Sequence, residues 1–149
     1  MLLRVIQPHE LPALLDLYTH LHDQDEPIPE RSLVDSVWQK ALSNPRIRYF
    51  GGYAGQQLLC SCTLTVIPNL TRACRPYAVI ENVVTHPAHR GQGWGQALLA
   101  HALAFAWEQR CYKAMLLTGR KDEGTLRFYE RAGFDPHGKQ AFVAKPGTP

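Results

Sequence analysis

A glycine-rich turn between an apolar strand and a long apolar helix constrains this chain more than any other segment. Residues 83–85 are all β-branched and predict a strand, and Gly91, Gly93 and Gly95 then lead into a helical run of apolar residues. The first N–H groups of a helix have no partner inside it, and the helix dipole is positive at that end. Glycines remove the Cβ atoms that would block a ligand. The segment therefore predicts a binding site for a phosphate or pyrophosphate.

Length and composition indicate one globular domain over residues 1–149. The chain is 45% hydrophobic and 19% charged, which is ordinary for a globular protein of this size. Its net charge of +3 is small, and it contains no run of lysine or arginine. We therefore expect no nucleic-acid partner.

The cysteines and the N-terminus indicate a compartment. None of the four cysteines forms a C-x-x-C pair, which excludes zinc-ribbon and thioredoxin-like motifs and favours reduced thiols. Cys60 and Cys62, two residues apart in a strand-like run, are expected to behave as small apolar residues. The first residues hold too short an apolar run for a signal peptide, and no window reaches transmembrane length. We expect a cytoplasmic protein with no membrane partner.

Apolar periodicity and turn residues predict alternating strands and helices. The expected strands cover residues 2–7, 47–54, 58–67, 77–85 and 113–118, with a last strand or strands at Phe134 and residues 140–144. The expected helices cover residues 9–21, 32–42, 93–110 and 125–132. Since the strands occur both singly and in a hairpin, the sheet is expected to be mixed.

Two motifs in register resemble the GNAT N-acetyltransferase superfamily. Residues 90–95 (RGQGWG) are similar to its R/Q-x-x-G-x-G/A loop, and residues 128–134 (FYERAGF) are similar to its F-Y-x-x-x-G-F block. Residues 81–84 (ENVV) resemble the corresponding strand of glucosamine-phosphate acetyltransferases and their relatives. The resemblance covers residues 77–134. It implies the GNAT fold, an α/β domain of the α+β type with a mixed, mostly antiparallel sheet flanked by helices on both faces.

In that family the loop binds the pyrophosphate of acetyl-CoA, which is the implied co-substrate. Backbone amides would donate to phosphate oxygens and Arg90 would add charge, so the implied contacts are Arg90, Gly91, Gln92, Gly93, Trp94, Gly95 and Gln96. The strand before the loop is expected to splay from its neighbour, which would free main-chain groups of Val83, Val84 and Thr85 for the pantetheine arm. The alternatives are a glycine-rich turn without a ligand and an ordinary paired strand.

The resemblance implies acetyl transfer to a primary amine by direct attack. A protonated amine has no lone pair, so a base must remove a proton, and Glu81 is the candidate. Its apolar strand is expected to desolvate the carboxylate and favour proton uptake. Tyr129 is the candidate acid for the departing thiolate, because a phenol is protonated at pH 7. The alternatives are a structural carboxylate at a sheet bulge and a core aromatic beside Phe128 and Phe134.

Two further positions carry weaker signals. Asp122 stands where many relatives carry Asn, so a cofactor contact through this side chain is in question, and the alternative role is to cap the helix that follows. His86 and His89 form an H-x-x-H pair, but no third ligand accompanies them and we expect no metal site.

The sequence leaves the acceptor and one rival function open. The acidic segment 23–30 would attract a cationic amine, whereas Arg72 and Arg75 would suit a phosphate or carboxylate, and solvated surface charge is the alternative for both. The expected acceptor is a small-molecule amine, with a protein amine left open. The rival function is a non-catalytic acyl-CoA-binding sensor on the same fold. Relatives often dimerise through their last strands, which makes a homodimer the corresponding expectation.

Overall fold

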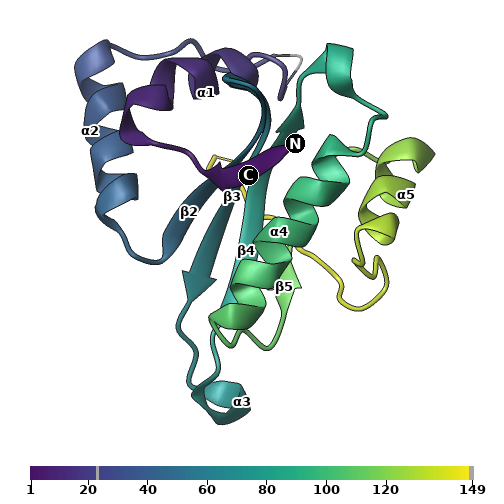
Figure 1. Cartoon of the computed structure of the whole chain (residues 1–149). Helices are drawn as coiled ribbons and strands as arrows, with labels where there is room; N and C mark the ends of the chain where they lie inside the picture. Colours follow the sequence, from purple (N-terminus) through teal and green to yellow (C-terminus); the bar gives the residue numbers. More distant parts are fainter. Residues whose placement is uncertain (23, 148–149) are drawn as a thin grey trace. The chain divides into compact units, whose positions relative to one another are not determined.

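The computed structural model describes residues 1–22 and 24–147, which fall into two compact units (Figure 1). The first unit, Met1–Leu116, contains the sheet and the helices that cover it. The second unit begins at Leu117 and contains helix α5 (Glu123–Arg131). The glycine turn and Glu81 therefore belong to the first unit, and Tyr129 belongs to the second. Asp23 of the acidic segment lies outside the described residues.

The first unit is built on a five-stranded sheet with the order β1-β2-β3-β4-β5. Its strands are β1 (Leu2–Val5), β2 (Ile47–Ala54), β3 (Gln57–Ile67), β4 (Tyr77–Thr85) and β5 (Ala114–Met115). The first four strands pair antiparallel and β5 pairs parallel to β4, which confirms the mixed, mostly antiparallel sheet. The described helices of this unit are η1 (Pro8–Glu10), α1 (Leu11–Tyr18), α2 (Arg31–Ser43), α3 (Thr71–Cys74), η2 (Pro87–His89) and α4 (Trp94–Glu108).

Helices cover both faces of the sheet, because alternate residues of its central strands meet different partners. On one face, the ring of Tyr49 in β2 lies 4.9 Å from that of Trp38 in α2, and Leu14 of α1 belongs to the same apolar cluster. On the other face, the ring of Phe50 lies 5.4 Å from that of Phe105 in α4. Burial from both sides explains why residues 58–64 of β3 are all buried.

The two cysteines of β3 are packing residues, as the sequence predicts. Cys60 and Cys62 are both fully buried. Burial raises the pKa of the Cys60 thiol to about 11 and raises that of the Cys62 thiol as well. Because the thiolate is the reactive form, neither side chain is a nucleophile at neutral pH.

Several predicted elements are corrected. Helix α1 ends at Tyr18 rather than at residue 21, and β5 is only two residues long. The strand expected at Phe134 and residues 140–144 is wrong, since the described part of the second unit contains no strand. There, Asp135 accepts a hydrogen bond from the backbone N of His137 at 2.8 Å and forms a turn. Residues 135–147 are all exposed, so none of them contributes to a packed core.

An ion pair ties the first strand to the first helical turn. Arg4 donates from both Nη atoms to the two carboxylate oxygens of Glu10, at 2.7 and 2.8 Å. The same carboxylate accepts from the backbone N of Gln7 at 2.6 Å and from the hydroxyl of Tyr53 at 3.1 Å. The hydrogen bonds from Arg4 lower the pKa of Glu10 from 4.5 to about 2. The half-buried carboxylate of Glu10 thereby joins β1, η1 and β2.

The stability conferred by this carboxylate should depend on pH. A group whose pKa is lowered on folding stabilises the native state above its unfolded pKa, and that stabilisation is lost as pH falls through the folded pKa. We expect Glu10→Gln to lower the free energy of unfolding by about 2 kcal/mol at pH 7. The difference from the parent protein should shrink between pH 4.5 and about 2. Urea denaturation between about pH 2 and pH 7 measures the free energy of unfolding of both proteins, with the exposed Glu108→Gln as control. A difference in that free energy that does not depend on pH would contradict the account.

Candidate functional site

The turn that precedes α4 forms an open backbone cradle. Gly91 and Gly93 have φ angles of +75° and +83°, a region that side-chain-bearing residues rarely adopt, and Gly93 is the N-cap of α4. A Cβ placed on either glycine would meet no atom within 4 Å. No side chain caps the helix, so its first N–H groups are left for solvent or a ligand. Residues 91–93 are exposed, and together these features make a positive, accessible helix start.

Side chains of the turn hold this cradle in place. Arg90 donates from Nε to the carbonyl of Thr85 at 3.1 Å and from Nη2 to the carbonyl of His20 at 3.4 Å. A guanidinium carries five N–H donors, so others remain available at the exposed surface. The ring of His86 lies 4.8 Å from that of His20, and Gln92 donates to the carbonyl of Ala88 at 3.2 Å. The end of α1 and the end of β4 are thereby fixed against the turn.

β4 leaves most of one edge without a strand partner. Its pairing with β5 is limited to Ala78 and Val79, whereas its pairing with β3 runs to Thr85. Within the described residues, positions 81–85 of β4 therefore have no strand partner on the β5 side. An edge of this kind presents free N–H and C=O groups. Val83, Val84 and Thr85 lie on this edge and lead directly into the cradle.

A bulge in β4 sets the direction of Glu81. Ser61 pairs with Val84 and Thr63 pairs with Glu81, so one residue of β3 between them faces two residues of β4. Asn82, one of those two, has a φ of +53°. Directly paired residues share a face of the sheet, so the bulge brings Glu81 onto the face of Val84 and α1. Glu81 is nevertheless exposed, so the desolvation expected from its apolar strand is wrong.

In the second unit, Tyr129 lies between two aromatic neighbours. Its ring is 4.9 Å from that of Phe128 and 6.2 Å from that of Phe134, and its side chain is half-buried. Gly133 has a φ of +93° and follows the end of α5, which turns the chain back so that Phe134 reaches Tyr129. Phe128, Tyr129 and Phe134 thus form a local aromatic cluster around the phenol.

Asp122 caps α5. Its carboxylate accepts from the backbone N of Thr125 at 2.9 Å and from Arg120 at 3.0 Å. The hydrogen bond from Thr125 lowers the pKa of Asp122. The capping role left open by the sequence is confirmed.

The charged residues considered for the acceptor lie at different places in the first unit. Asp25, Glu26 and Glu30 are exposed in the segment before α2. Arg72 and Arg75 lie in and after α3, with guanidinium carbons 5.8 and 6.0 Å from the ring centre of Tyr112. Figure 1 shows α3 beside the first residues of β4, whereas α4 starts near the last residues of that strand. The two arginines are therefore remote from the cradle.

Sequence reasoning missed a buried polar cluster beside Glu81. The hydroxyl oxygens of Tyr18, Ser61 and Thr63 are buried and have no hydrogen-bond partner among the described protein atoms. Tyr18 occupies a helical position that is typical of core residues, and Ser61 and Thr63 alternate with buried cysteines. No sequence signal could have found this cluster, because it depends on the register of β3 and on the packing of α1.

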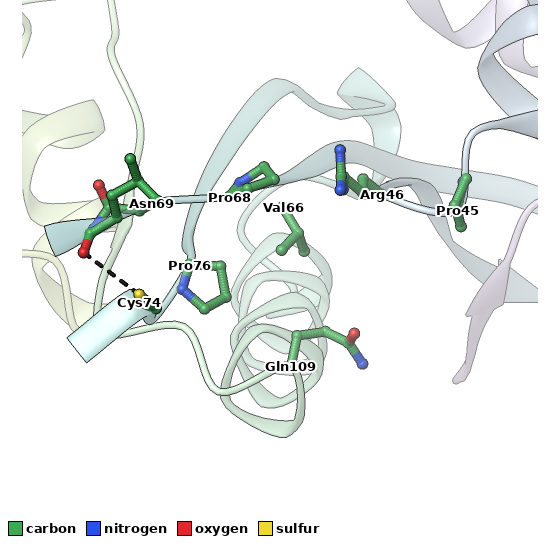
Figure 2. A pocket seen from close by; sticks show the side chains of 9 residues that line it. Pro45, Arg46, Val66, Pro68, Asn69, Cys74, Pro76 and Gln109 are labelled. Atoms are coloured by element: carbon green, nitrogen blue, oxygen red, sulfur yellow. Dashed lines mark hydrogen bonds between the residues drawn. The ribbon is translucent and has the colours of Figure 1, made fainter. Parts of the chain in front are cut away.

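Other site types find little support in the described residues. No group of three or more histidine, cysteine, aspartate or glutamate side chains is placed there to hold a metal ion. In the same part of the chain, no helix has both the length and the apolar character needed to span a membrane. A pocket of about 420 Å³ opens near Asn69, Cys74 and Gln109, away from the cradle (Figure 2).

Comparisons with known proteins agree with this geometry. The model of the acetyltransferase (GNAT) family matches residues 11–134. Glucosamine 6-phosphate N-acetyltransferase of Trypanosoma brucei brucei is 30% identical over 138 residues, which make up 93% of this chain and 91% of that protein. A solved structure from Agrobacterium tumefaciens str. C58 that carries an acetyltransferase name matches with a TM-score of 0.91 and 40% identity, over 97% of this chain and 99% of that chain.

A more distant structure shows the fold alone. The solved glucosamine-6-phosphate N-acetyltransferase of Arabidopsis thaliana has a TM-score of 0.83 at 16% identity, over 99% of this chain and 98% of that chain. The family match includes the cradle, β4 and the aromatic motif of Tyr129. The chain therefore belongs to the acetyltransferase (GNAT) family and is an acetyltransferase.

Proposed function

We propose that this chain transfers the acetyl group of acetyl-CoA to the primary amine of a small molecule. The observation that carries the proposal is the uncapped start of α4, which follows the unpaired edge of β4 after a short turn that includes η2. When bound, acetyl-CoA supplies the thioester carbon that the amine attacks. The family match extends over both compact units, which supports one acetyltransferase domain over residues 1–149.

The cradle suits a pyrophosphate. Backbone N–H groups from Gly91 to Gln96 would donate to its oxygens, and the helix dipole favours negative charge at this position. The positive φ angles of Gly91 and Gly93 keep the backbone bare where the ligand would approach. Arg90 would contribute the N–H groups that are not used on the carbonyls of Thr85 and His20.

The edge of β4 suits the amides of the pantetheine arm. Main-chain groups of Val83, Val84 and Thr85 would pair with them as an added strand does. A backbone N–H near Val83, at the bulge, would stabilise the oxyanion that forms when the amine attacks. This placement brings the reacting carbon close to the bulge that presents Glu81.

Glu81 and Tyr129 are proposed to move the protons. The carboxylate of Glu81 is open to an incoming ammonium group, and binding of the acceptor would remove water from it in the complex. Tyr129 would donate its phenolic proton to the departing thiolate, with its ring held by Phe128 and Phe134. The ammonium group thus loses one proton to Glu81 and attacks as the neutral amine. When the tetrahedral adduct collapses, the sulfur gains a proton from Tyr129, and the phenolate is reprotonated by the second proton that the nitrogen releases.

The proposed acceptor is an amino sugar that carries a phosphate. The relative from Trypanosoma brucei brucei bears the name of glucosamine 6-phosphate, and it is similar to this chain over nearly its whole length. A thiol-release assay with glucosamine 6-phosphate, unphosphorylated amino sugars, polyamines and peptides tests both the reaction and the acceptor. Binding of acetyl-CoA without turnover on any amine would instead favour the acyl-CoA sensor.

The cradle can be tested by adding a side chain at Gly93. We expect Gly93→Val to raise the Kd for acetyl-CoA at least tenfold, because a β-branched residue does not adopt the φ of +83° and its methyl groups would occupy the cradle. Gly55, in the turn between β2 and β3, has a φ of +58° and equally open surroundings. Gly55→Val is therefore the matched control, with a similar loss of stability and unchanged affinity. Equal calorimetric affinities for the two variants would refute the cradle.

Replacement of Glu81 tests the base. We expect Glu81→Gln to lower kcat/KM for the amine by about 10²-fold near neutral pH, with a smaller loss at high pH, where more of the amine is already deprotonated. Affinity for acetyl-CoA should be unchanged, and Glu108→Gln, at an exposed site at the end of α4, should behave as the parent protein. The pH–rate profile measures the effect. A loss of the same size at every pH would point to a structural role.

Replacement of Tyr129 tests the acid. Phenylalanine keeps the aromatic cluster with Phe128 and Phe134 and removes only the proton donor. We expect Tyr129→Phe to lower kcat by about 10²-fold while the Kd for acetyl-CoA changes less than threefold. Tyr112→Phe, in the first unit, serves as the control. Full activity of Tyr129→Phe in single-turnover measurements would show that the assignment of the acid is wrong.

A further inference from the structure

Three buried hydroxyl groups meet between α1 and β3. The side-chain oxygens of Tyr18, Ser61 and Thr63 are all inaccessible, and none has a hydrogen-bond partner among the described protein atoms. Ser61 is 0% exposed and Thr63 is 8% exposed. Burial raises the pKa of Tyr18, and hydrogen bonding with the hydroxyls of Thr63 and Ser61, at a geometry short of a full hydrogen bond, lowers it in part. The three groups are therefore neighbours, although none of them meets hydrogen-bond geometry with another.

The register of the sheet places this cluster next to Glu81. Ser61 and Thr63 are two residues apart in β3 and point to the same face, which α1 covers. Thr63 is paired directly with Glu81 of β4, and the bulge turns Glu81 toward that same face. Directly paired residues have Cβ atoms about 5 Å apart. The other ionisable groups that act on Tyr18 are Tyr49 and Cys62, and burial raises the pKa of both, so they are neutral at physiological pH.

A single water molecule would satisfy this arrangement. Buried hydroxyls without partners are costly, and native proteins rarely keep several together. A buried water typically makes about three hydrogen bonds, with a maximum of four. Two of the hydroxyls could donate to such a water, which would then have two hydrogen atoms to donate. One would go to the third hydroxyl, and the other is free for a carboxylate that faces the same side.

We propose that Tyr18, Ser61 and Thr63 hold a buried water that donates a hydrogen bond to the carboxylate of Glu81, which makes the three hydroxyls positioning residues for proton removal. The inference rests on the proposed role of Glu81 as the base. The water orients the carboxylate and stabilises its charged form, and it undergoes no bond cleavage. Helix α1 thereby contributes to the reaction through Tyr18 without touching the substrate.

The site can first be tested without any measurement of activity. A crystal structure of the parent protein at about 1.5 Å resolution should show one water within hydrogen-bond distance of all three hydroxyl oxygens. Ser61→Ala should lower Tm, because it removes a partner of that water. If the cluster is dry, Ser61→Ala removes a costly group and raises Tm. An absent water or a raised Tm would overturn the proposal.

Kinetics then test the link to Glu81. Thr63→Val keeps the shape of the side chain, and we expect it to lower kcat/KM for the amine about tenfold and to move the acidic limb of the pH–rate profile to higher pH, because the charged carboxylate loses a hydrogen bond. Tyr18→Phe should do the same. Thr65→Val, on the same strand and face but outside the cluster, should change neither quantity. The Kd for acetyl-CoA should be unchanged in all three variants.

The outcomes separate this inference from the proposed function. If Glu81→Gln loses activity while Thr63→Val and Tyr18→Phe behave as Thr65→Val, the positioning role is overturned and the base assignment stands. If Glu81→Gln is as active as the parent protein, the proposed base is wrong and the link from the water to the reaction falls with it. Thermal denaturation of each variant confirms that a loss of rate does not reflect unfolding.

Discussion

The unpaired N–H groups at the start of α4 are the feature on which the rest of the site depends. A helix that begins at a left-handed glycine with no capping side chain keeps its positive end open. Here a short turn that includes η2 separates that end from β4, and Arg90 holds this turn through hydrogen bonds to the carbonyls of Thr85 and His20. An anion bound at this point has a fixed position relative to the strand, so its attached chain would run along the edge of β4 toward the bulge.

The bulge in β4 determines which side chains of this strand share a face. One extra residue, with Asn82 in the left-handed region, changes which side chains share a face, so that Glu81 and Val84 both turn toward the side covered by α1. Without it, residues three apart in a strand would point to opposite faces. The same shift places Glu81 beside Thr63, and thus beside the buried hydroxyls of Tyr18 and Ser61. The proposed base is exposed to the acceptor and adjoins a polar interior.

Sequence reasoning reached the parts of the structure that local chemistry dictates. β2 and β4 were predicted with their observed bounds, and the glycine spacing located the turn before α4. Both predictions succeeded because β-branched runs and glycine turns determine backbone conformation within a few residues of the chain. The strand predicted at residues 140–144 failed because pairing requires a partner that the local pattern does not reveal. The exposure of Glu81 and the convergence of Tyr18, Ser61 and Thr63 depend on register and helix packing, which no local pattern encodes.

The central claim is that the bare backbone at the start of α4 binds the pyrophosphate of acetyl-CoA. A crystal structure of the chain with coenzyme A tests it most directly. The account predicts pyrophosphate oxygens within hydrogen-bond distance of backbone nitrogens between Gly91 and Gln96, with the pantetheine amides paired to residues 83–85 of β4. A coenzyme bound with its pyrophosphate elsewhere on the chain would contradict the account.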